Sequence, residues 1–109
     1  MICVTIVQNK DKQIRAFQVS GHAGYAESGQ DIVCSAVSAL TITTINAMEL
    51  YTSQSFEIDQ DEEDGIITVN FSDNLNHDAE LLMNSLILGL RSIENEYNDE
   101  YIHVEFREV

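Results

Sequence analysis

The sequence predicts an α+β fold with the element order ββαββαβ, a sandwich of a largely antiparallel sheet and two long helices. Two observations predict it: strand-like stretches come in pairs, and two longer stretches repeat apolar residues at helical spacing. The chain has 109 residues, of which 44% are hydrophobic. Since this is enough to bury one hydrophobic core, we expect a single domain over residues 1–109.

The first two strands are expected at residues 2–8 and 14–20. Both stretches are apolar and rich in β-branched residues, and the polar residues 9–12 between them suit a hairpin turn. Residues 21–30 read as a loop that holds three of the five glycines: Gly21, Gly24 and Gly29. Because glycine readily adopts positive φ, we expect this loop to be mobile.

The first helix is expected to begin after Asp31, a residue type that suits the N-cap. The apolar side chains that follow share one stripe: Val33, Val37, Leu40, Ala47 or Met48, and Tyr51. Residues 32–48 carry no charge, but their serines and threonines argue against a membrane span. We therefore expect a helix buried against the sheet and, in an oligomer, against a partner subunit.

The second half of the chain repeats the pattern of strands and helix. Strands are expected at residues 56–59 and 66–71, joined by an acidic turn that ends at Gly65. After the polar residues 72–78, a second amphipathic helix is indicated by Ala79, Leu82, Met83, Leu86, Ile87, Leu90 and Ile93. A last half-buried strand is indicated by the alternation of Tyr101, His103, Glu105 and Arg107 with Ile102, Val104 and Phe106.

The composition is strongly acidic, with 19 Asp plus Glu, 5 Lys plus Arg and a formal net charge of -14. Affinity for nucleic acid depends largely on Lys and Arg that neutralise phosphates, so we expect no direct nucleic-acid partner. A basic partner is expected instead. The N-terminal residues lack the features of a signal peptide, which predicts a cytoplasmic protein whose two cysteines stay reduced.

The residues with the clearest chemistry are His22 and Cys34. With Asp31 as the N-cap, Cys34 falls at about the third helical position, where unpaired N–H groups and the helix dipole favour a thiolate. His22 could take the thiol proton, and the N–H groups of the helix start could hold an oxyanion. Taken singly, each could be structural. Their combination with a glycine-rich hinge favours a catalytic pair.

Asp31 has two candidate roles. As the N-cap it would accept hydrogen bonds from the first N–H groups of the helix. Alternatively, its carboxylate would orient the imidazole of His22, as the third member of a catalytic triad does. The cap is the simpler role, and the sequence leaves both open.

Residues 21–26, Gly-His-Ala-Gly-Tyr-Ala, and residues 29–38, Gly-Gln-Asp-Ile-Val-Cys-Ser-Ala-Val-Ser, resemble the signature of the ribosomal-processing cysteine proteases of Firmicutes and related bacteria. The length and element order are similar over essentially the whole chain. This resemblance implies a catalytic dyad of His22 and Cys34, a glycine-rich loop that covers the site, and a homodimer.

The resemblance also implies the substrate, the precursor of large-subunit ribosomal protein twenty-seven, from which the enzyme removes a short N-terminal extension. Ribosomal proteins are generally basic, so the acidic charge of the chain would attract this precursor. The alternative is a non-catalytic acidic protein that binds a ribosomal protein or an assembly factor. The reactivity of the Cys34 thiol distinguishes the two, because only the enzyme requires a reactive thiolate.

Phosphate and calcium sites fit the sequence less well. The glycines of the loop match no phosphate-binding pattern. Residues 57–64 carry six carboxylates in eight positions, but EF-hand registers that start at Asp59 or Gln60 lack required ligands. We expect a solvated hairpin turn there, which could also attract a basic substrate.

The other histidines and cysteine have simpler interpretations. His77 is expected at a helix start and His103 on a strand face, both far along the chain from Cys34, so we expect no metal site and no cofactor. Cys3 lies in the first strand beside apolar neighbours, and we expect a buried, unreactive thiol.

Overall fold

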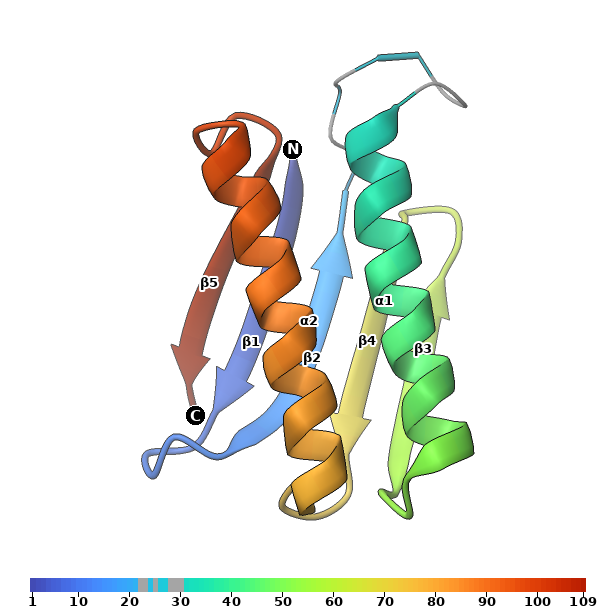
Figure 1. Ribbon diagram of the computed structural model, residues 1–109, viewed down its shortest axis with the longest axis vertical. Coiled ribbons are helices and arrows are strands. Elements are labelled where there is room, and N and C mark those ends of the chain that lie inside the picture. Colours follow the sequence, from blue (N-terminus) through green and yellow to red (C-terminus); the bar gives the residue numbers. More distant parts are fainter. Residues whose placement is uncertain (22–23, 25, 28–30) are drawn as a thin grey trace.

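The computed structural model confirms the predicted order of elements and the largely antiparallel sheet (Figure 1). The structure describes residues 1–21, 24, 26–27 and 31–109. The strands are β1 (Ile2–Gln8), β2 (Ile14–Ser20), β3 (Phe56–Asp61), β4 (Ile66–Phe71) and β5 (Ile102–Glu108), and the helices are α1 (Ile32–Tyr51) and α2 (His77–Glu96). Strand β3 is longer than expected because its ladder with β4 continues to the pair of Asp61 and Ile66.

The order of strands in the sheet is β3-β4-β2-β1-β5. All neighbours are antiparallel except β1 and β5, which are parallel and therefore need the crossover that α2 provides. Because β2 lies beside β4, the end of β2 meets the β3–β4 turn. Ser20 pairs with Ile66, and the Gly21 N–H donates to the Gly65 carbonyl at 3.3 Å.

The core lies between the sheet and the two helices, which cover the same face (Figure 1). Its largest fully buried side chains are Phe17, Ile6, Met48, Met83, Leu86, Leu90 and Ile102. On α1, Val33 and Val37 are buried as expected, and Thr41 continues their stripe. Tyr51 is 79% exposed, contrary to expectation, because α1 ends at this residue.

Cys3 corrects a prediction, because its thiol is exposed rather than buried. Side chains alternate between the two faces of a strand, and Ile2 and Val4 occupy the core face, so Cys3 points to the opposite face of the sheet. Its neighbours across β2 and β5 are Ser20 and His103. The apolar run of the first strand concealed this alternation.

Strand β5 lies at one edge of the sheet, and α2 packs against this strand. The buried carboxylate of Glu94 accepts the Val104 N–H at 2.6 Å and lies 3.4 Å from His103 Nδ1. Phe106 was expected to face inward but is 40% exposed, with the guanidinium of Arg91 5.0 Å above its ring. The edge position accounts for this exposure, because β5 has a neighbouring strand on one side alone.

By length and composition alone, α1 is able to cross a membrane, with a mean hydropathy of 1.4. In the fold, its buried residues belong to the core between the sheet and the helices. The helix therefore has the environment of the core helix of an α+β sandwich.

Candidate active site

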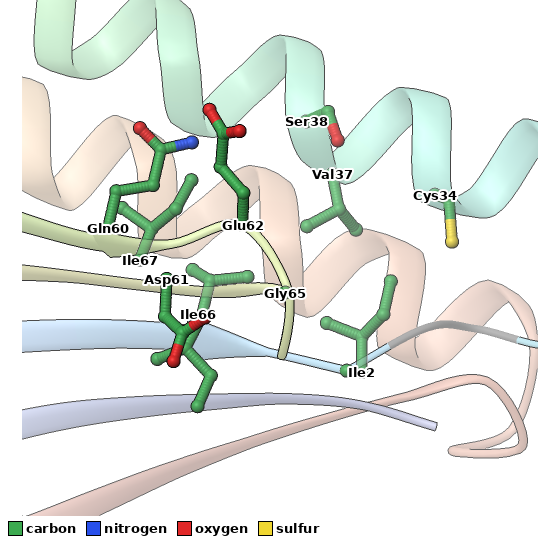
Figure 2. A pocket seen from close by; sticks show the side chains of 12 residues that line it. Ile2, Cys34, Val37, Ser38, Gln60, Asp61, Glu62, Gly65, Ile66 and Ile67 are labelled. Carbon is green, nitrogen blue, oxygen red and sulfur yellow. The ribbon is translucent and has the colours of Figure 1, made fainter.

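Cys34 is the third residue of α1, and its half-buried side chain lines a cleft at one end of the sheet (Figure 2). The helix starts here because the Asp31 carboxylate accepts the N–H groups of Val33 and Cys34, each at 3.0 Å. Asp31 is 7% exposed, so these bonds are shielded from water. The N-cap role of Asp31 is thus observed, and it fixes the backbone that carries the thiol.

The same cap limits which N–H groups are available for the oxyanion that we expect at the helix start. We expected the N–H groups of the helix start to hold it, but Val33 and Cys34 donate theirs to Asp31 Oδ1. The Ser35 N–H already donates to the Asp31 carbonyl at 3.0 Å. The N–H groups of Val33 and Cys34 can therefore serve an oxyanion only when the carboxylate releases them.

Gly21 sets the direction in which the chain leaves β2. Its φ is +90°, and a Cβ at this position would lie 2.4 Å from the Met1 carbonyl oxygen. Any other residue would combine backbone strain with a clash against backbone. Gly24 also has positive φ, at 72°, but a Cβ there would meet open space. Position 21 thus requires glycine both for its φ and for lack of space, whereas position 24 favours glycine for its φ alone.

His22 and Gly29 lie outside the described residues. The predicted dyad of His22 and Cys34, the orienting role of Asp31 and the mobility of the loop therefore stay predictions. The structure establishes that Gly21, the first residue of the loop, lines the same cleft as Cys34.

The cleft has a volume of about 320 Å³ and is formed by segments far apart in the sequence. Helix α1 supplies one wall through Cys34, Val37 and Ser38, and β3 with the following turn supplies the other through Gln60, Asp61, Glu62 and Gly65. Ile2, Val19 and Ile67 line the cleft from the sheet face that the helices cover, whereas Ile66 and its ladder partner Asp61 belong to the opposite face, at the edge of the lining. Sequence reasoning found Cys34 but missed the second wall, for which the acidic run was the only sequence signal.

Neither of the histidines that the structure describes lines this cleft. His77 is the first residue of α2, is exposed and lies 3.3 Å from the Asp78 carboxylate. His103 lies on β5 beside Glu94. Within the described part of the chain, no group of three or more His, Cys, Asp or Glu side chains is placed to hold a metal ion.

Known proteins resemble this chain over nearly its whole length. The family model described as cysteine protease Prp matches residues 1–103. The ribosomal processing cysteine protease Prp of Bacillus subtilis strain 168 is 35% identical, in an alignment that covers 91% of this chain and 92% of the relative. The protein of that name from Staphylococcus aureus strain Mu50 is 33% identical, with coverage of 91% and 93%.

Solved structures agree with the sequence matches. A crystal structure of the essential ribosomal processing protease Prp from S. aureus, in complex with a covalently linked product peptide, has a TM-score of 0.92 at 33% identity. A crystal structure of the S. aureus protein with a substrate peptide has a TM-score of 0.87 at 32% identity. Each match covers 98% of this chain and 100% of the other. The chain therefore belongs to the cysteine protease Prp family.

Proposed function

We propose that this cysteine protease removes the N-terminal extension from the precursor of large-subunit ribosomal protein twenty-seven, with Cys34 as the nucleophile and His22 as the proton donor. The observation that carries the proposal is the position of Cys34, on the first turn of α1 and in the wall of a cleft of about 320 Å³. The S. aureus relatives are bound to a substrate peptide and to a covalently linked product peptide, which supports nucleophilic catalysis on a peptide.

The proposed reaction is acyl transfer. The Cys34 thiolate attacks the carbonyl carbon of the scissile bond and forms a tetrahedral oxyanion. His22 then donates a proton to the leaving amine as the C–N bond breaks, which leaves a thioester on Cys34. Water hydrolyses the thioester, releases the second product and restores the thiol. In this scheme Asp31 positions the nucleophile, because its carboxylate holds the backbone N–H of Cys34.

We also propose that the protein acts in the cytoplasm as a homodimer. A cytoplasmic location is supported by the two cysteines, neither of which forms a disulfide. Dimerisation is supported by apolar side chains on the outer surface of α1, where Ile32, Ile42 and Leu50 are 56%, 43% and 73% exposed. Light scattering coupled to size-exclusion chromatography tests the dimer: a mass near 12.2 kDa at micromolar concentration would contradict it.

The decisive experiment is incubation of the ribosomal precursor with wild type and with Cys34→Ala, followed by measurement of the intact mass. We expect wild type to shorten the precursor, and Cys34→Ala to bind the precursor but leave its mass unchanged. Cys3→Ala is the matched control, because Cys3 is also a thiol but lies on the opposite face of the sheet. It should cleave at the wild-type rate.

Two results would contradict the proposal. Cleavage by Cys34→Ala would show that another group is the nucleophile. Binding of the precursor by wild type without any change in its mass would favour the alternative, a non-catalytic acidic protein that binds a ribosomal protein.

A further inference from the structure

We propose that the Glu62 carboxylate forms a subsite of the Cys34 cleft that selects a lysine or arginine side chain of the peptide substrate, close to the scissile bond. This inference rests on the proposed function, because it concerns the residue preference of that same cleft. It differs from attraction by the net charge of -14, which acts at long range and favours no particular position in the peptide.

The direction of the Glu62 side chain is the first observation. On β3, Gln60 shares the face of Ile67 and Val19, and Ile67 lies between the sheet and α1. Asp61 pairs with Ile66 and so belongs to the opposite face. Figure 2 shows Glu62 reaching toward α1, as Gln60 does, whereas Asp61 points away. Glu62 therefore faces the helix that carries the nucleophile.

The charge of the cleft is the second observation. Of the twelve described residues that line it, Asp61 and Glu62 are the charged ones, and both are acidic. The Asp61 carboxylate accepts the Asp64 N–H at 3.1 Å, which stabilises the turn. Among the described residues, Glu62 takes part in no hydrogen bond or ion pair that would neutralise it. A cation that enters the cleft thus meets one uncompensated carboxylate.

The opposite wall contributes no competing charge. Residues 32–48 of α1 are uncharged, and the cleft is lined there by Cys34, Val37 and Ser38. Glu62 is exposed to solvent, so its attraction to a bound ammonium or guanidinium has the modest strength of a surface ion pair. A neutral or acidic substrate side chain beside Glu62 would not form this favourable ion pair.

The spacing along α1 limits where the basic residue lies. Ser38 follows Cys34 by one helical turn, about 6 Å along the axis at 1.5 Å per residue. An extended peptide covers this length with about two residues at 3.3 Å each. In Figure 2, Glu62 lies farther from Cys34 than Ser38 does. We place the lysine or arginine within about three residues of the scissile bond.

The test is a set of peptides based on the cleavage site, with lysine or its neutral analogue norleucine at each of the three positions on either side of the scissile bond. Wild type, Glu62→Gln and Asp61→Asn are each assayed by kcat/KM. The two variants remove one negative charge each from adjacent residues, so they change long-range steering equally. Asp61 at the end of β3 and Glu62 in the turn are both exposed to solvent. Thermal melts verify that both variants are folded.

At one position, we expect wild type to prefer lysine over norleucine by about two- to fivefold in kcat/KM. Glu62→Gln should lose that preference through KM with kcat unchanged, because the contact binds substrate and transition state alike. Asp61→Asn should keep it. Glu62→Lys should prefer glutamate at the same position, which a merely structural role would not produce.

Three outcomes overturn the subsite. Equal loss of the preference in Glu62→Gln and Asp61→Asn would show general steering by charge. Cleavage by wild type without a lysine preference at any position would refute the subsite and leave the proposed function standing. Failure of wild type to cleave any peptide or the precursor would refute the proposed function, and the subsite with it.

Discussion

Replacing Asp31 with alanine tests whether this residue holds the nucleophile's helix in place. The substitution removes the oxygen that accepts the N–H groups of Val33 and Cys34 at 3.0 Å, at a position that is 7% exposed. Loss of such a cap costs about 1–2 kcal/mol of unfolding free energy. With an unfolding entropy of about 2 cal/mol/K per residue, this lowers Tm by about 4–9 °C for a chain of this length.

Asp31→Asn is the matched control, because its amide oxygen still accepts these N–H groups while the negative charge is removed. We expect it to lose less than about 0.5 kcal/mol. Urea denaturation with an unchanged m value measures both differences. An Asp31→Ala variant as stable as wild type would refute the capping argument. Wild-type stability in Asp31→Asn with a large loss of kcat would instead indicate that the charge orients His22.

Three further predictions concern the site. Gly21→Ala should lower the unfolding free energy by at least about 2 kcal/mol, because φ is +90° and the new Cβ would approach the Met1 carbonyl to 2.4 Å; a chemical denaturation curve shows this. In a Cys3→Ser background, which removes the exposed second thiol, iodoacetamide should label Cys34 and abolish cleavage at the same rate; full activity after complete labelling would contradict the nucleophile assignment. Raising ionic strength from about 10 to about 150 mM should lower kcat/KM for a basic precursor several-fold and leave a neutral peptide unaffected, as measured by initial rates.

The elements that carry strong local signals were predictable from the sequence. Strands β1, β2 and β4 have the expected bounds, because β-branched runs and their turn residues report directly on local conformation. The start of α1 was equally accessible, since an N-cap interaction spans only Asp31 to Cys34. The position of Cys34 on the first helical turn follows from that same short segment.

The exposure of Cys3 could not be read from the sequence, because it depends on which face of the sheet the helices cover. Val4 and Cys3 are adjacent in an apolar strand, yet one is fully buried and the other exposed. This difference affects the alkylation experiment, because two accessible thiols compete for the reagent. Without substitution of Cys3, the measured alkylation would be the sum of labelling at Cys3 and at Cys34.

The second wall of the cleft depends on sheet topology, which local patterns do not encode. The acidic run is about thirty residues from Cys34 in the chain, and it reaches the cleft because β4 pairs with β2 rather than with β5. That pairing seats Gly65 against Gly21, so the hairpin turn, the first residue of the loop and the start of α1 meet at one end of the sheet. A charge run that reads as a solvated turn thereby becomes part of the site. Asp61, the last residue of β3, faces away from α1, whereas Glu62, the first residue of the turn, reaches toward it, so the proposed subsite gives these neighbouring carboxylates different roles.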